Sequence, residues 1–304
     1  MIKYDAGSLI KRLRQQKDMT QEQLAEYAGI DRATLSKIEN GKATANSSTL
    51  HAIFQKLGVD PSGLSGYFLS RKETEWDSAR AEIEASASQG NYEKVYALIE
   101  ELENDAEYMA KNTNRQYVMY VRGFSHIYTG KNAEEAIEMF DEAIKMTLPH
   151  FSQKYLDDYH LTSLEINICS SKATALSISQ RNEEAIELMY ALKENFDKNC
   201  IDRNLWGKLY PNIIYYLTRF LYLAKRYQEA LELCEIGRKT AMAGYTVLLP
   251  QIMLNKAYIL HALGDNEGSE QTFRNVYHTY LLYGMSGQAE AVKRDTKKYL
   301  DVDL

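Results

Sequence analysis

The sequence predicts an all-α protein in which a small N-terminal helical domain precedes a longer array of helical hairpins. The 304 residues include only 4 Pro and 16 Gly, and 45% are hydrophobic against 26% charged. This composition is too apolar and too poor in helix breakers for a disordered protein. A short polar phrase also recurs five times, each time between two amphipathic stretches, which is typical of helical repeats.

The first two helices of the N-terminal domain are predicted from local start and stop signals. A short basic helix spans about residues 8–18. Thr20 and Gln23 have the spacing of a capping box, so a second helix begins at Thr20. It ends at Gly29, where a left-handed backbone conformation costs least.

A third helix follows directly and completes a helix-turn-helix. Asp31 caps it, and Leu35 and Ile38 share its apolar face. Its polar face carries basic side chains, and Gly41 ends it near residue 40. A fourth helix from about residue 48 to 57 and a fifth after Pro61 complete the predicted bundle.

The residues of this segment resemble a known DNA-binding module. The pattern is Gln21-x-x-Leu24-Ala25-x-x-Ala28-Gly29-Ile30-x-x-x-x-Leu35-Ser36-x-Ile38-Glu39-Asn40-Gly41. Over about residues 8–64 it is similar to the DNA-binding domain of the phage-repressor (Cro/C1, or XRE) family. The resemblance implies that Arg14 pairs with Glu39 between the first and third helices, in a structural role.

The resemblance also implies which residues contact DNA. The third helix would lie in the major groove, which is wide enough to admit a helix. Base-edge and phosphate contacts are expected from Gln21, Arg32, Ala33, Ser36, Lys37, Asn40 and Lys42. Asn40 and Lys42, just past the helix, are the expected phosphate contacts.

The charge of the protein is uneven along the sequence. Residues 1–70 carry 9 Lys or Arg and 7 Asp or Glu, whereas residues 71–304 carry 27 and 35. The N-terminal part, which we call the head, is thus basic, and the rest of the protein is acidic. A basic head suits the binding of nucleic acid. Residues 69–80 are polar but poor in Gly and Pro, so we expect a helical linker between a DNA-binding domain at 1–68 and a repeat domain at 81–304.

The repeat domain is recognised by its recurring phrase. The small anchor residues of the five copies lie 41, 49, 45 and 39 positions apart, and they are Val95, Ala136, Ala185, Ala230 and Ser269. The hairpins, for example 167–179 followed by 183–195, resemble the tetratricopeptide repeat with longer helices. The resemblance implies a right-handed α-solenoid whose first helices line a concave surface.

Counting back from the last three anchors separates a polar face from a packing face. At 18 residues back all three side chains are amides: Asn167, Asn212 and Gln251. At 11 and 8 residues back they are Thr174, Arg219, Tyr258, Ser177, Tyr222 and His261. At 16 and 9 residues back, the predicted packing face has Cys169, Ile214, Met253, Leu176, Leu221 and Leu260.

A row of amides suits an extended peptide, because a carboxamide donates to a backbone carbonyl and accepts from a backbone N–H. The alternative is that these side chains only contact water. Together, the two resemblances identify the peptide-responsive regulators of Gram-positive bacteria, the PlcR/PrgX/Rgg group. In that group a re-imported short peptide binds the concave surface and changes dimer geometry or oligomeric state.

The combined resemblance therefore implies a cytoplasmic homodimer that regulates transcription in quorum sensing, with a palindromic double-stranded DNA operator and a short signalling peptide as partners. Two heads would bind half-sites one helical turn, or a multiple of it, apart. The candidate peptide contacts are Arg122, Asn167, Ser170, Thr174, Asn212, Tyr215, Arg219, Tyr222, Gln251, Asn255 and Tyr258.

Other functional classes lack their signatures. There is no phosphate loop, no metalloprotease helix motif and no nucleophile elbow, so we expect no enzyme, no catalytic residue, no cofactor and no metal. The three widely spaced cysteines fit a reducing compartment rather than a disulfide framework or a zinc site. No signal peptide or membrane-spanning run is apparent, so we expect neither secretion nor a membrane partner.

Two alternatives remain open at this point. The head binds DNA while the repeats bind a protein partner or only oligomerise, or the protein is a helical scaffold whose head binds no operator. Replacement of Arg32 and Lys37 by Ala distinguishes the last alternative from the others, because unchanged DNA affinity would exclude DNA binding by the head.

Overall fold

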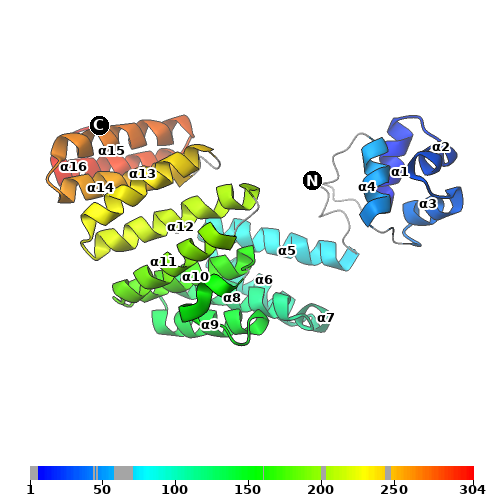
Figure 1. The fold of residues 1–304 in the computed structure, drawn as a ribbon, viewed down its shortest axis with the longest axis horizontal. Coiled ribbons are helices and arrows are strands. Elements are labelled where there is room, and N and C mark those ends of the chain that lie inside the picture. The colour runs from blue at the N-terminus through cyan, green and yellow to red at the C-terminus, as the bar shows by residue number, and fades with distance from the viewer. Residues whose placement is uncertain are drawn as a thin grey trace. The chain divides into compact units, whose positions relative to one another are not determined.

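The computed structural model describes residues 6–43, 45, 47–57, 71–159, 161–199, 203–243 and 248–304. The protein forms two compact units, residues 1–98 and 99–304, and all the regular elements of the described residues are helices. The predicted all-α class is confirmed (Figure 1). None of the helices in these residues is both long and apolar enough to cross a bilayer.

The first unit begins with four short helices around one core. They are α1 (Ala6–Gln16), α2 (Gln21–Ala28), α3 (Arg32–Glu39) and α4 (Ser47–Lys56). Ile10, Leu24, Leu35, Ile53 and Phe54 are fully buried against one another. The predicted fifth helix after Pro61 lies outside the described residues.

The predicted caps position α2 and α3. The Thr20 hydroxyl accepts from the Gln23 N–H at 3.2 Å, and the Gln23 side chain accepts from the Thr20 N–H at 2.8 Å. Gly29 has the left-handed φ of 68°, and the carboxylate of Asp31 accepts from the Thr34 N–H at 2.8 Å. These local interactions fix the turn between α2 and α3.

A buried ion pair ties α1 to α3, as the family resemblance implies. Arg14 Nε and Nη2 donate to the two carboxylate oxygens of Glu39 at 2.6 and 2.9 Å. The Glu39 side chain is fully buried. Gln21 Nε2 adds a third hydrogen bond to this carboxylate at 2.8 Å, so all three helices meet at Glu39.

Two longer helices follow in sequence, α5 (Arg71–Ser88) and α6 (Tyr92–Glu103). The helical start of α5 agrees with a helical linker, although residues 69 and 70 lie outside the described residues. The functional boundaries at 68 and 80 remain a prediction.

The second unit is a row of helical hairpins (Figure 1). Its elements are α7 (Ala106–Met109), α8 (Asn112–Tyr128), α9 (Ala133–Thr147), the 3-10 helix η3 (Gln153–Asp158), α10 (Ser163–Ile178), α11 (Asn182–Asn199), α12 (Arg203–Leu223), α13 (Tyr227–Ala243), α14 (Leu249–Ala262), α15 (Asn266–Leu282) and α16 (Ser286–Leu300). Consecutive helices pack as pairs, and the first helices α8, α10, α12 and α14 neighbour one another in order. This is the predicted stacking of repeats.

The recurring phrase forms the turn between the two helices of each hairpin. The turn residue is left-handed in all five copies: Gly90, Gly130, Gln180, Lys225 and Gly264. Gly284, between α15 and α16, is left-handed as well. The N–H that follows it donates to the C=O five residues earlier, as in Arg181 to Leu176 and Arg226 to Leu221, both at 2.9 Å. The anchors Val95, Ala136, Ala185, Ala230 and Ser269 are fully buried. Small anchors let the two helices of a hairpin approach closely.

Two of these turns use a residue with a side chain, which leads to a prediction. Gln180→Gly and Lys225→Gly should each raise the free energy of unfolding by about 0.5–1 kcal/mol, because the left-handed strain that glycine removes exceeds the entropy that it adds to the unfolded state. Urea denaturation of the full-length protein measures the change. Gln180→Ala, which keeps the strain, is the control, and a loss of stability in both glycine variants would contradict the prediction.

Candidate nucleic-acid interface and inner stripe

The candidate DNA-binding face lies on α3 and is exposed. Leu35 and Ile38 are buried in the core, while Arg32, Ala33 and Lys37 are exposed. Helix α3 therefore presents its polar face outward, with Arg32 and Ala33 in its first turn. This is the end that reads base edges in helix-turn-helix domains.

Arg32 is paired only weakly in the free protein. Its Nε lies 2.9 Å from Glu22 Oε1, but both side chains are more than 60% exposed. An exposed pair of this kind contributes roughly 0–1 kcal/mol, so it is readily exchanged for a phosphate or a base.

The remaining predicted DNA contacts differ in their exposure and in their hydrogen bonds within the protein. The amide nitrogen of Gln21 is held by Glu39, as described above, and Asn40 Nδ2 donates to the C=O of Ser36 at 2.8 Å. Ser36 is half-buried and Lys42 is exposed. Arg32, Lys37 and Lys42 are thus the exposed cations of the set.

A second candidate site follows from the turns of the repeat unit. We call inner stripe the residues 13, 9, 6 and 2 positions before the left-handed turn residues Gln180, Lys225 and Gly264. They are Asn167, Ser171, Thr174 and Ile178 on α10, Asn212, Tyr216, Arg219 and Leu223 on α12, and Gln251, Asn255, Tyr258 and Ala262 on α14. All of these residues are at least partly exposed. This spacing lies on one face of a helix, so the inner stripe is one continuous surface on each first helix.

The predicted packing face is buried opposite this stripe. Cys169, Leu176, Ile214 and Leu221 are at most 3% exposed. Burial raises the pKa of the Cys169 thiol to about 12, so this thiol is not reactive at neutral pH. Met253 is the exception, because it is only partly buried.

Two polar positions on α10 depart from the predicted solvent-facing set. The hydroxyl of Ser177 donates to Asn182 Oδ1 at 2.8 Å, and the residue is buried. Ser170 is 3% exposed, and its hydroxyl donates to the C=O of Ile166 at 2.9 Å. Counting from the anchor does not reveal that the Ser170 hydroxyl is satisfied within its own helix, or that the Ser177 hydroxyl is satisfied by the first residue of α11.

The three amides differ in their partners. Asn167 and Asn212 are half-buried. Gln251 Oε1 is buried and accepts no hydrogen bond within the described residues. A buried amide oxygen without a donor costs about 1–3 kcal/mol, so an N–H from a ligand would be favourable there.

Other predicted contact residues are engaged between helices. Asn255 Nδ2 donates to the C=O of Tyr215 at 3.1 Å and to Thr218 Oγ1 at 2.9 Å, which joins α14 to α12. The hydroxyl of Tyr258 donates to Asp295 on α16. Tyr222 packs beside Tyr258, with ring centroids 6.2 Å apart.

The remaining predicted peptide contacts are Thr174, Tyr215 and two arginines. The hydroxyl of Thr174 donates to the C=O of Ser170 at 3.0 Å. Arg122 Nη2 donates to both oxygens of Glu103 at 2.7 Å. Arg219 is exposed, and no carboxylate pairs with it among the residues that the structure describes. Tyr215, one turn before it, is half-buried against Tyr216.

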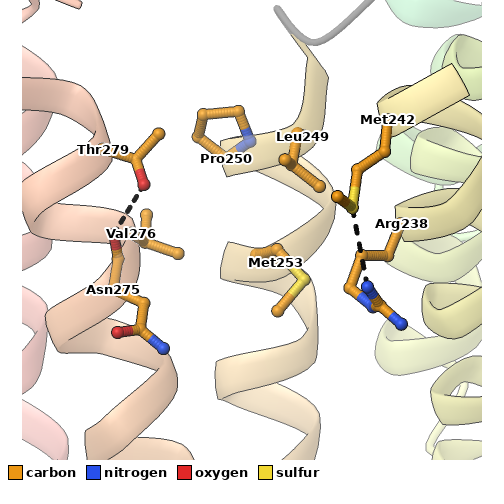
Figure 2. Close-up of a pocket in the computed structure, with 8 residues that line it drawn as sticks. All are labelled: Arg238, Met242, Leu249, Pro250, Met253, Asn275, Val276 and Thr279. Carbon is orange, nitrogen blue, oxygen red and sulfur yellow. Dashed lines mark hydrogen bonds between the residues drawn. The ribbon is translucent and has the colours of Figure 1, made fainter. Parts of the chain in front are cut away.

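A pocket of about 180 Å³ lies elsewhere, between α13, α14 and α15. Figure 2 shows its lining residues, which are Arg238, Met242, Leu249, Pro250, Met253, Asn275, Val276 and Thr279. None of the predicted peptide contacts lines this pocket. Sequence reasoning missed it because Met253 was assigned to the packing face, and the pocket depends on how three helices meet.

Comparison with known proteins identifies the head. The helix-turn-helix family model matches residues 10–64. An immunity repressor protein of Bacillus phage phi105 is 34% identical over 74 residues, which are 24% of this protein. The match spans about half the length of that relative. Residues 10–64 are therefore a helix-turn-helix domain.

The fold of the whole protein is similar to that of two solved structures. PlcR of Bacillus thuringiensis, in complex with the peptide PapR7 and DNA, matches with a TM-score of 0.73 at 16% identity over 95% of this protein and 98% of PlcR. The SHP pheromone receptor Rgg2 of Streptococcus dysgalactiae matches with a TM-score of 0.63 at 14% identity over 97% of this protein and 99% of Rgg2. The predicted likeness to this group is confirmed for the fold.

Proposed function

From a helix-turn-helix domain joined to the fold of PlcR and Rgg2, we infer that this protein is a DNA-binding transcription regulator controlled by a short signalling peptide. The observation that carries the proposal is the presence, in one molecule, of an exposed basic face on α3 and of amides at one repeated position on α10, α12 and α14. The first suits DNA and the second suits a peptide backbone.

The DNA arm of the proposal uses α3 in the major groove. Arg32 and Lys37 would contact base edges, while Lys42 would contact a phosphate. A homodimer would place two such helices on half-sites about 34 Å apart, or a multiple of it, which calls for a palindromic operator.

The peptide arm uses the inner stripe. Asn167 and Asn212 would each donate to and accept from the backbone of an extended peptide. Gln251 Oε1 would accept a peptide N–H, which would satisfy its buried oxygen. An amide occupies the same position, 13 residues before the turn, on α10, α12 and α14. This favours a ligand that runs across the three helices.

Peptide binding would act by selecting one arrangement of the dimer. A ligand shifts an equilibrium only by the difference between its affinities for the two arrangements. The proposal therefore requires that the inner stripe bind the peptide more tightly in one of them.

A second candidate function has one observation in its favour. The pocket between α13, α14 and α15 is lined mainly by apolar side chains, and Met242, one of its lining residues, is 60% exposed. Such a surface suits a protein partner or a second copy of the molecule. In this alternative the head binds DNA, and the repeats serve only assembly.

Native mass spectrometry of the protein purified from dense cultures of its natural host tests the proposal. A stoichiometric bound mass in the range of a short peptide supports it. A co-purified protein in place of the peptide supports the alternative. An unliganded protein at every growth stage sampled would contradict peptide control.

The double variant Asn167→Ala, Asn212→Ala is expected to lower the affinity for that peptide by roughly 100-fold or more, because several hydrogen bonds of about 1 kcal/mol each are lost. The two side chains are half-buried and lie outside the packing face, so the fold should persist. Titration calorimetry measures the affinity, and circular dichroism checks the fold. Asn275→Ala, which removes an exposed amide from the pocket between α13, α14 and α15, is the matched control and should bind normally. Unchanged affinity in the double variant would remove these two residues from the site.

A further inference from the structure

Arg219 differs from the paired basic residues on the other first helices of the hairpins because it has no acidic partner among the described residues. On neighbouring first helices, Arg122 pairs with Glu103 at 2.7 Å, Lys172 with Asp141 at 2.6 Å and Lys256 with Glu235 at 2.5 Å. Arg219 lies on the inner stripe of α12, is exposed and has no carboxylate partner in the described part of the sequence. Its guanidinium therefore presents an uncompensated positive charge on that surface.

Tyrosine residues flank Arg219 along α12. Tyr215 and Tyr216 precede Arg219 by one turn, and Tyr222 follows it by three residues. Burial raises the pKa of the Tyr216 phenol, with smaller contributions from Tyr128, Tyr215 and Tyr120, while the charge of Arg219 lowers it. Tyr216 precedes Arg219 by three residues, so the two side chains are neighbours on the surface of α12. Arg219 is exposed, so a carboxylate of a ligand can reach its guanidinium from solution.

A row of exposed apolar side chains lies beside the charge. Tyr128, Ile178 and Leu223 occupy the same place, two residues before the left-handed turn residue, on three neighbouring helices. They are 51%, 51% and 48% exposed, and this exposure recurs at one repeat position. Leu223 lies one helical turn beyond Arg219, so the row borders the charge.

The inner stripe thus has three chemically different parts along α12. Along the helix, Arg219 lies about 10 Å from Asn212 and about 6 Å from Leu223, given a rise of 1.5 Å per residue. Amides that suit a peptide backbone lie at one end, apolar side chains lie at the other, and the cation lies between them. The peptide backbone would be bound at Asn212, about 10 Å from Arg219 along the helix. A peptide side chain of four or five atoms and the Arg219 side chain together span this distance.

We propose that the ligand of the inner stripe is a short, mainly apolar peptide that carries a carboxylate bound by Arg219. This inference rests on the proposed peptide function and specifies its chemistry. The carboxylate is either an Asp or Glu side chain or the C-terminus, and the adjacent side chains pack on Tyr128, Ile178 and Leu223. The path from α8 to α12 is two steps of about 10 Å, which an extended peptide spans in about six residues.

Retention of synthetic heptapeptide libraries on the immobilised full-length protein tests this assignment. All libraries have random apolar residues around a fixed central position. The first has Glu at the centre and blocked termini, the second has Gln and blocked termini, the third has Gln and a free C-terminal carboxylate, and the fourth has Lys and blocked termini. Mass spectrometry of the eluate measures enrichment.

The expected result is that the protein enriches a carboxylate library at least tenfold over the blocked Gln library. Enrichment of the first library identifies a side-chain carboxylate, and enrichment of the third identifies the C-terminus. Arg219→Gln should abolish the preference, and Arg219→Glu should shift it to the Lys library. Lys145→Gln, which removes an exposed cation from α9, is the control and should keep the preference.

Two outcomes overturn the inference, and they differ in what they leave standing. If the parent protein and Arg219→Gln retain the blocked Gln library as well as the carboxylate libraries, carboxylate recognition fails and the peptide function stands. If none of the four libraries is retained by any of the proteins, both fail. Circular dichroism of each variant verifies that the exposed substitutions leave the helices intact.

Discussion

The double variant Arg32→Ala, Lys37→Ala is expected to bind a DNA duplex selected by the full-length protein at least 100-fold more weakly than the parent. Both side chains are exposed on α3. A good contact to a base edge contributes about 1–3 kcal/mol, so two such contacts account for this loss. Selection from a random duplex library supplies the probe, and fluorescence anisotropy measures the affinity.

A matched control separates specific contacts from general charge. Lys11→Ala, Lys17→Ala removes the same charge from α1 and from the residue that follows it, and both side chains are exposed. It should lower the affinity only slightly and to the same extent for selected and random DNA, because remote charge acts through the salt-dependent electrostatic contribution. Equal losses in the two double variants would contradict a base-reading role for α3.

Replacement of Arg14 by methionine is expected to give the largest loss of stability in the head. It leaves the carboxylate of Glu39 fully buried without its ionic partner. Removing one member of a buried ion pair costs about 3–5 kcal/mol, which is a large part of the stability of a small domain. Hydrogen exchange of the full-length protein should show amides of α1–α4 exchanging roughly 100-fold faster or more, while amides of α8–α15 stay unchanged.

The double variant Arg14→Met, Glu39→Leu is the informative control. It replaces the pair by apolar side chains, which is often neutral or stabilising. Recovery of protection in the double variant would attribute the loss to the unpaired charge. Continued rapid exchange would instead attribute it to lost packing.

The same pair makes the stability of the head depend on pH. Burial alone would raise the pKa of Glu39, but the hydrogen bonds from Arg14 and Gln21 and the charge of Arg14 outweigh it and lower the pKa below its ordinary value of 4.5. The ionised carboxylate thus stabilises the head above that value, and this contribution is lost as the pH falls through the lowered pKa. In Glu39→Gln the protection of α1–α4 should change less steeply over the same acid range.

The head was predictable from sequence because its signals are local. The capping box at Thr20, the left-handed Gly29 and the cap Asp31 each act within a few residues of themselves. The ion pair between Arg14 and Glu39 spans 25 residues and came only from the family resemblance. Local chemistry thus sets the helices, while the contact that joins them needs the fold.

The inner stripe was predictable in its positions but not in its partners. Counting from the anchors found Asn167 and Arg219 because each first helix ends at a fixed turn. It did not predict that Asn255 is bound to α12, or that Tyr258 is bound to Asp295. Those contacts depend on how neighbouring helices approach. For the same reason, the lone charge of Arg219 emerged only once the ion pairs of the neighbouring helices were known.

The left-handed turns also determine where the protein tolerates insertions and deletions. Helix α10 ends at Ile178 and α11 begins at Asn182, whereas α9 ends at Thr147 and α10 begins at Ser163. Length variation between repeats thus collects in the connection from the second helix of one hairpin to the first helix of the next. A residue added there leaves every inner-stripe side chain at the same count from its own turn. Repeats of unequal length therefore keep the inner-stripe residues aligned, and the connections between hairpins can vary in length without losing that alignment.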